Sequence, residues 1–180
     1  MGVEFERRFL LSALPNGFDW VYTKVIRQVY WDLGDGWALR LRRQGEADFP
    51  DDVVTLKGPR HGSSRPEYEW GLGAEEENGH NSSSDPAHRS QSANPDAASL
   101  YRAGARRQIV KTRRGAVVDG VTWDFDEFHF ANEGLFIAEV EMKDRAAVDA
   151  IKQPAWAVRE VTDDPRFNNE NLAVTPFTAW

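Results

Sequence analysis

Residues 4–11, Glu-Phe-Glu-Arg-Arg-Phe-Leu-Leu, are the stretch from which the rest of this chain can be interpreted. Side chains alternate between two faces along a β-strand, which places Glu4, Glu6 and Arg8 together on one face. The opposite face is mainly apolar. A strand with a charged, solvent-facing side would show the same pattern, so this stretch alone does not distinguish a binding site from an ordinary solvent-exposed surface.

The composition indicates one domain of ordinary size. The chain has 180 residues, of which 41% are hydrophobic, and its net charge of −7 argues against a general nucleic-acid-binding surface. The absence of cysteine excludes disulfides and thiolate zinc sites. Because there is no apolar run of membrane-spanning length and no signal-peptide pattern, we expect a cytoplasmic protein, bacterial or similar, without a membrane or nucleic-acid partner.

The alternation of residues 4–11 returns along the chain. We expect further strands at 28–33, 37–43, 53–58, 65–72, 108–113, 121–130 and 135–143. We expect helices within 12–28, 97–108 and 145–153, a polar loop at 45–52, a turn region at 115–120 and an irregular end at 159–180. Residues 74–98 contain no large hydrophobic residue and are expected to form a mobile insertion within a single domain spanning 1–180.

The charged residues of the expected strands share one face. The cations are Arg8, Arg40, Arg42, Lys57, Arg65, Lys111 and Arg113. The carboxylates are Glu4, Glu6, Glu67, Glu69, Asp124, Asp126, Glu139 and Glu141. Two arrangements fit this pattern: an open sheet with a solvated charged face, or a closed barrel whose charged face lines a channel while helices cover the apolar exterior.

The grouping of the charges favours the closed arrangement. Cations follow cations within a strand, and carboxylates follow carboxylates, so each group repels itself unless a counter-ion lies between its members. An anion relieves the cations, and a hard divalent metal ion relieves the carboxylates. A phosphate chain that arrives with its metal ion satisfies both groups, since arginine binds phosphate oxygens with two parallel hydrogen bonds.

The motifs in their order resemble those of the CYTH superfamily, the triphosphate tunnel metalloenzymes. Glu4-x-Glu6-x-Arg8 is similar to the family signature Glu-x-Glu-x-Lys, with arginine in place of the final lysine. The further matching motifs are Arg40-x-Arg42, Thr55-x-Lys57-Gly58, Arg65-x-Glu67-x-Glu69, Lys111-Thr112-Arg113, Trp123-x-x-Asp126-x-Phe128, Ala138-Glu139-x-Glu141 and Val161-Thr162-x-Asp164 with Arg166, Asn168 and Asn171.

The resemblance implies an α+β fold, an eight-stranded antiparallel β-barrel with a tunnel and a few outer helices. It implies that the substrate phosphates are bound by Arg8, Arg40, Arg42, Lys57, Arg65, Lys111, Arg113 and Arg166. It implies Mg²⁺ or Mn²⁺ held by Glu4, Glu6, Asp126, Glu139 and Glu141. Glu4, Glu6 and Arg8 would be the catalytic residues, with one of the two glutamates orienting the attacking water.

Several functions remain open at this point. The first hypothesis is metal-dependent hydrolysis of a triphosphate, with inorganic tripolyphosphate as the simplest substrate. Thiamine triphosphate, nucleoside triphosphates and cyclisation of ATP, as in class IV adenylate cyclases, are alternatives. A polyphosphate-binding module without turnover is a further alternative, because Arg8 replaces the compact lysine of the signature. The extent of the apolar outer faces is compatible with a homodimer.

Overall fold

The computed structural model describes residues 5–46, 49–59, 66–72 and 97–180. Glu4 and Arg65, two of the predicted site residues, lie outside these ranges, as does nearly all of the predicted insertion at 74–98. No helix in the described part of the chain is long and apolar enough to cross a membrane.

The described strands form one antiparallel sheet, with the order β5-β4-β3-β2-β6-β7-β8-β1-β9. The strands are β1 (Phe5–Leu11), β2 (Trp20–Gly34), β3 (Trp37–Glu46), β4 (Phe49–Lys57), β5 (Glu67–Leu72), β6 (Gln108–Val118), β7 (Val121–Phe128), β8 (Phe136–Met142) and β9 (Arg159–Glu160). The helices are α1 (Ala97–Ala103), α2 (Arg145–Ala150) and α3 (Asn169–Leu172), with the 3₁₀ turns η2 (Phe130–Asn132), η3 (Pro165–Phe167) and η4 (Phe177–Ala179).

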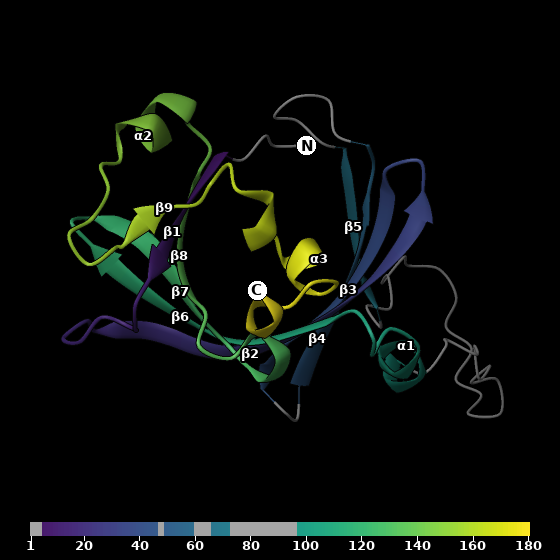
Figure 1. The fold of residues 1–180 in the computed structure, drawn as a ribbon. Helices are drawn as coiled ribbons and strands as arrows, with labels where there is room; N and C mark the ends of the chain where they lie inside the picture. The colour runs from purple at the N-terminus through teal and green to yellow at the C-terminus, as the bar shows by residue number, and fades with distance from the viewer. Residues whose placement is uncertain (1–4, 47–48, 60–65, 73–96) are drawn as a thin grey trace, which may run out of the picture.

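The sheet curls around the C-terminal part of the chain, as Figure 1 shows, with η3 and α3 on its concave side. The predicted α+β fold with eight long antiparallel strands is confirmed, and β9 adds a short ninth strand. The two outermost strands, β5 and β9, are not hydrogen-bonded to each other in the described residues, so the sheet is a curved, barrel-like wall and not a closed ring.

The helix predicted within residues 12–28 is wrong. Residues 20–34 form the strand β2, which pairs with β6 from Trp20 opposite Ala116 to Val29 opposite Gln108. Residues 20–31 are rich in valine and aromatic residues, which favour strands. The apolar spacing resembled that of a helix because β2 carries apolar residues on both faces. On its convex face Val29 and Trp31 pack in the core while Val21 and Val25 are exposed, and on its concave face Ile26 and Tyr30 are buried.

Two predicted connections are shorter than expected. The polar loop at 45–52 is largely strand, since β3 extends to Glu46 and β4 begins at Phe49. Strand β6 likewise runs to Val118 through the predicted turn region at 115–120. The chain reverses at Asp119 and Gly120, whose φ angles of 51° and 76° suit the tight turns that join twisted antiparallel strands.

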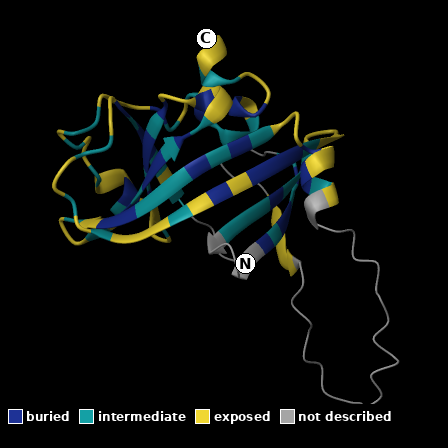
Figure 2. Cartoon of the chain, turned by 90° about the horizontal axis from the view of Figure 1, so that it is seen from below, coloured by how far each residue is buried: buried dark blue, intermediate teal, exposed yellow. Residues whose placement is uncertain are grey.

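The convex face of the sheet is apolar and is covered by the two longer helices and a connecting segment. Buried and more exposed residues alternate along the long strands (Figure 2). One cluster includes Phe9, Trp123, Phe125 and Val140, and packs against α2 and the segment around Trp156. A second cluster places Tyr101 of α1 against β2, β3 and β4. The prediction of an apolar exterior under helices therefore holds for these strands.

The Tyr101 side chain anchors α1 to the sheet. It is 6% exposed, and its hydroxyl donates to Asp52 Oδ1 over 3.4 Å, while Arg43 binds the same carboxylate over 2.8 and 2.6 Å. We expect Tyr101→Phe to lower the free energy of unfolding by about 1 kcal/mol, because the long hydrogen bond to a buried charge is lost while the ring remains. Urea unfolding measures this. Tyr68→Phe on the exposed outer side of β5 is the matched control, and an equal loss in both variants would contradict the assignment.

The concave face is divided along its length. One end is apolar: Ile109, Phe128 and Ile137 pack under Phe167 and Leu172 of the C-terminal segment. Further along the same strands, the same face turns charged, as Lys111 follows Ile109 in the alternation and Glu139 follows Ile137. The C-terminal segment therefore fills one end of the curl, and the candidate site lies on the other part of the concave face.

Candidate functional site

The strand register brings the predicted cations and carboxylates together. Arg113 of β6 lies opposite Lys24 of β2 on one side and opposite Asp126 of β7 on the other. On the next strands, Glu139 of β8 lies between Asp124 of β7 and Arg8 of β1. Alternation and pairing thus place residues more than a hundred positions apart on one continuous concave surface.

A buried carboxylate holds two of the predicted phosphate ligands. Asp126 is 0% exposed, and its Oδ1 accepts from Arg113 Nε over 2.7 Å. Its Oδ2 accepts from Arg113 Nη2 over 2.6 Å and from Lys111 Nζ. Arg113 also binds Asp124 over 2.6 Å and contacts Glu139. Because both of its oxygens are engaged by cations, Asp126 is placed to position them and not to face a metal ion directly.

The charges of this group stabilise one another. Burial raises the pKa of the Asp126 carboxyl, but Lys111 and Arg113 outweigh burial and hold that pKa below its usual value. Burial also lowers the pKa of the Arg113 guanidinium, and Asp126 and Glu139 reverse this and raise the pKa well above its usual value. Both groups are therefore fully ionised near neutral pH.

The other half of the concave face carries Arg40 and Arg42 of β3 and Lys57 of β4. Arg40 Nη2 donates to Thr55 Oγ1 over 2.8 Å and to Glu69 Oε2 over 3.2 Å, and Lys57 pairs with Glu67 over 2.7 Å. Within the described part of the chain, the buried Nε atoms of Arg40 and Arg42 have no hydrogen-bond partner, and the same is true of the Arg8 Nε on β1. A buried donor without an acceptor is costly, so an anion that reaches the guanidinium groups of Arg40 and Arg42 would gain affinity there.

Glutamates of β1 and β8 are the candidate metal ligands. Glu6 lies directly opposite Glu141 across the β1–β8 pair, and Glu139 is the next residue of β8 on the same face. Like charges at opposed positions repel, and carboxylate oxygens are the ligands that Mg²⁺ and Mn²⁺ prefer. The donor set therefore fits such an ion. No ready-made group of three ligands exists among the described residues, however, and Glu139 is held by Arg113.

Arg8 is tied to the C-terminal segment. Its Nη1 donates to the Phe167 carbonyl over 2.9 Å, and its Nη2 donates to the Thr162 carbonyl over 2.9 Å and to Asn168 Oδ1 over 2.7 Å. Its Nε lies 3.6 Å from Glu6. Four contacts thus occupy a side chain that is 8% exposed, which places Arg8 as a structural anchor beside the glutamates.

Arg166 is not brought to the other cations. Its Nη2 binds Asp164 over 2.7 Å, and its guanidinium stacks 5.2 Å from the centre of the Trp180 ring, with 61% of the side chain exposed. The hydrogen bonds to Arg166 hold the pKa of Asp164 below its usual value. The expected role over a terminal phosphate would require Arg166 to leave these partners.

Strand β2 also contributes to this face, which the sequence pattern did not predict. Tyr22, Lys24 and Gln28 all belong to the row that includes the buried Tyr30, and Tyr22 donates its hydroxyl proton to Asp124. Burial raises the pKa of Tyr22, and Asp124 raises it further. The available signal was the content of valine and aromatic residues in 20–31, because Lys24 to Gln28 do not alternate between polar and apolar.

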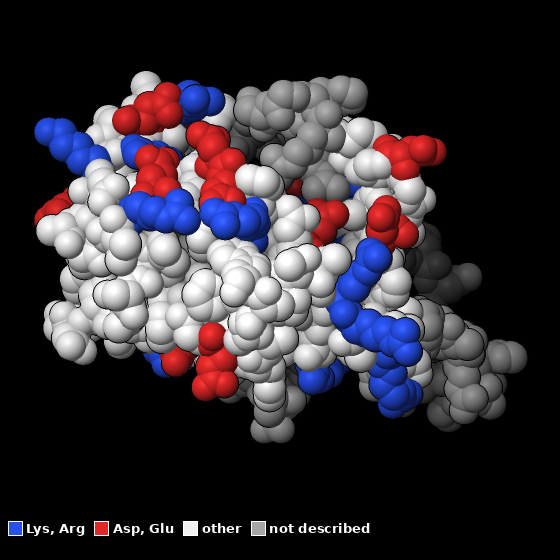
Figure 3. All heavy atoms as spheres, in the orientation of Figure 1, with Lys and Arg blue, Asp and Glu red and all other residues white. Residues whose placement is uncertain are grey.

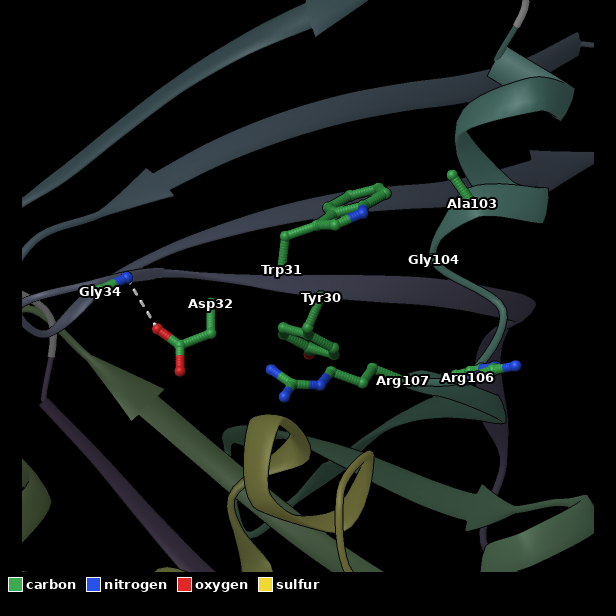
Figure 4. Close-up of a pocket in the computed structure, with 8 residues that line it drawn as sticks. All are labelled: Tyr30, Trp31, Asp32, Gly34, Ala103, Gly104, Arg106 and Arg107. Carbon is green, nitrogen blue, oxygen red and sulfur yellow. Dashed lines mark hydrogen bonds between the residues drawn. The ribbon is translucent and has the colours of Figure 1, made fainter.

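Figures 3 and 4 show the outer surface of the molecule and a pocket beside the concave face. Figure 4 shows Tyr30 and Trp31 on opposite sides of β2, with the Arg107 guanidinium on the Tyr30 side, near the C-terminal elements. These residues line a pocket with Gly104, Arg106 and the end of β2. In Figure 3, acidic and basic side chains adjoin around α2 and β9, and basic ones gather over the end that carries α1. This outer surface mixes both signs, in contrast to the ordered rows of the concave face.

A curved antiparallel sheet whose concave face is lined by cations and carboxylates defines a binding protein for polyanions. The chain belongs to the CYTH family, since the CYTH domain profile matches residues 3–171. An inorganic triphosphatase of Acetivibrio thermocellus is 33% identical, over 98% of this chain and 97% of its own length. An inorganic triphosphatase of Nitrosomonas europaea is 31% identical, with 96% and 97% covered. The crystal structure of the inorganic triphosphatase NE1496 superposes with a TM-score of 0.66 at 29% identity, covering 97% of this chain and 96% of that one.

Proposed function

We propose that this protein is a metal-dependent triphosphatase that hydrolyses inorganic tripolyphosphate. The observation that carries the proposal is the pair of buried Nε donors on Arg40 and Arg42, which lack acceptors on the same concave face as the grouped glutamates. The relatives with the name inorganic triphosphatase match nearly the whole chain, which supports the same substrate class.

The roles follow from the geometry. Arg40, Arg42 and Lys57 would bind phosphate oxygens from one side of the curl, and Lys111 and Arg113 from the other. Glu6, Glu139 and Glu141 would hold Mg²⁺ or Mn²⁺, which when bound neutralises charge on the phosphoryl group that is transferred. Glu6 would also orient the attacking water, a role that it shares as a candidate with Glu4.

The argument for a polyphosphate-binding module without turnover becomes weaker. That alternative rested on arginine replacing lysine at position 8, and the structure gives this arginine contacts to three acceptors of the C-terminal segment. A lysine offers one ammonium group and could not bridge the same acceptors in this geometry. The substitution is therefore explained without a loss of catalysis. The choice between Mg²⁺ and Mn²⁺, the homodimer and the cytoplasmic location stay predictions.

The test of the proposal is phosphate release from tripolyphosphate, ATP and thiamine triphosphate, each with Mg²⁺, with Mn²⁺ and with EDTA. We expect release that depends on the metal ion and is fastest with tripolyphosphate. Faster release from either organic substrate would assign the site to that substrate. Tight binding of tripolyphosphate without release from any of the three would establish the binding module instead.

Glu139 offers a test of the metal site. We expect Glu139→Gln to raise the metal concentration for half-maximal activity by at least about tenfold, because one charged ligand becomes a neutral amide. Titration of Mg²⁺ and Mn²⁺ at saturating tripolyphosphate measures this. Glu133→Gln, an exposed glutamate just before β8, is the control. An unchanged metal requirement in Glu139→Gln would remove Glu139 from the ligand set.

A further inference from the structure

Lys24 lies between the two groups of cations on the concave face. It is opposite Arg113 in the β2–β6 register, and Arg42 on the other neighbouring strand is close enough to affect its charge. The group on β6 comprises Lys111 and Arg113, and the group on β3 and β4 comprises Arg40, Arg42 and Lys57. Strand β2 joins these two halves of the sheet, so Lys24 stands at the point where a phosphate chain bound by both would pass.

The Lys24 side chain packs over the ring of Tyr22 on the same strand. Its ammonium lies 5.3 Å from the centre of the Tyr22 ring. That ring lies across β6 at Gly115, where any Cβ would overlap it, and its hydroxyl reaches Asp124 on β7. Glycine at 115 therefore allows the tyrosine to lie flat, and the tyrosine supports the lysine above the row of charges.

Lys24 differs from the other cations of this face in its partners. Lys111 and Arg113 bind Asp126, Arg40 binds Glu69 and Lys57 binds Glu67. No carboxylate of the described residues lies within ion-pair distance of Lys24, although Asp124 and Asp126 are near enough to act on it electrostatically.

The surroundings of Lys24 disfavour its positive charge. Burial lowers the pKa of the Lys24 amine, and repulsion by Arg113 and Arg42 lowers it further, against the attraction of Asp124 and Asp126. A bound polyanion would relieve this repulsion between the three cations.

We infer that Lys24 is a further substrate-binding residue, whose ammonium contacts the phosphate chain between the Arg113 side and the Arg42 side of the curl. This inference rests on the proposed function. It assigns Lys24 a role in binding. The candidate metal ligands and the glutamates that would orient the attacking water lie on other strands. The loss of Lys24 therefore weakens substrate affinity and leaves the turnover of bound substrate nearly intact.

The experiment compares Lys24→Met, Lys24→Arg and a control, Lys152→Met, at an exposed lysine beyond α2. We expect Lys24→Met to raise the KM for tripolyphosphate about tenfold with kcat changed less than about twofold, as the loss of one charge-assisted contact predicts. Calorimetry of tripolyphosphate binding in EDTA should show the same loss of affinity without metal or turnover. Lys24→Arg should restore binding to within about threefold of the wild type, since it keeps the charge.

The outcomes separate the two claims. If the wild type hydrolyses tripolyphosphate while Lys24→Met binds it as tightly as Lys152→Met does, the role of Lys24 is refuted and the proposed function stands. A fall in kcat with unchanged KM would also refute it. If the wild type neither binds nor hydrolyses tripolyphosphate, both are overturned. Circular dichroism and the melting temperature of each variant show whether the sheet is intact.

Discussion

Asp126→Ala is expected to lower the free energy of unfolding by about 3–5 kcal/mol, the range found when one partner of a buried ion pair is removed. Lys111 is 1% exposed and would be left in the interior without its carboxylate, and Arg113 would lose two hydrogen bonds. We also expect tripolyphosphate hydrolysis to fall at least about a hundredfold, because both cations that Asp126 positions would move. Urea unfolding and phosphate release measure the two effects.

A double variant distinguishes charge burial from simple loss of packing. Lys111→Met with Asp126→Leu replaces the pair by apolar side chains of similar volume, and we expect it to recover most of the stability while activity stays lost. Asp124→Asn is the milder control, because Arg113 keeps Asp126 and Glu139 as partners there. If Asp126→Ala were as stable as the wild type, the buried pair would have no structural role.

The same pair predicts how stability depends on pH. Because Lys111 and Arg113 hold the pKa of Asp126 below its usual value, its ionised form stabilises the folded state at neutral pH. That contribution is lost as the pH falls below about 4, the ordinary range of an aspartate, and through the lower pKa of the folded state. The double variant lacks this group, so its stability should fall less steeply on acidification than that of the wild type.

The alternation of side chains carried most of the correct predictions. It placed Arg40 with Arg42, Lys111 with Arg113 and Glu139 with Glu141, and the structure puts each pair on the concave face. Strand pairing then brings the pairs together. A period of two is visible in the sequence because one face of each strand meets the apolar core and the other does not.

The features that the sequence did not reveal are contacts between distant parts of the chain. Residues 12–28 were predicted as a helix from the spacing of Val21, Tyr22 and Val25, and no local pattern reveals that this segment pairs with the distant strand β6. The phosphate role of Arg8 stays a prediction, and the sequence gives no sign of its contacts with acceptors more than 150 residues away. Arg166 was placed by its motif, whereas the contact with Trp180 depends on how the chain end folds back.

Arg8→Met is expected to loosen the C-terminal segment and lower the free energy of unfolding by about 3 kcal/mol, because buried acceptors lose a charged donor. The Arg8 main chain is bound to the same segment: its N–H donates to Thr162 Oγ1 over 3.1 Å and its carbonyl accepts from Val161 N–H over 2.8 Å. These two bonds remain in the variant, so the segment should stay near β1 while the part around Phe167 and Asn168 becomes mobile.

Hydrogen exchange shows where the loosening occurs. We expect amides of residues 164–175 to exchange at least about tenfold faster in Arg8→Met without any substrate, and those of β7 to change only with the global stability. In Arg8→Lys, exchange of these amides should be faster than in the wild type and slower than in Arg8→Met, since one ammonium can reach only part of the acceptor set. Arg145→Met, at an exposed arginine of α2, is the control.

The two roles assigned to Arg8 make opposite predictions for the protein without substrate. A residue that binds phosphate makes its contacts only when substrate is bound. Its removal would therefore weaken tripolyphosphate binding and leave hydrogen exchange in residues 164–175 unchanged. An anchor acts at all times, and its removal speeds that exchange first. The second outcome would explain why an arginine is suited to position 8: three acceptors of the C-terminal segment converge on it, and the segment they belong to fills one end of the curl beside the glutamates of β1 and β8.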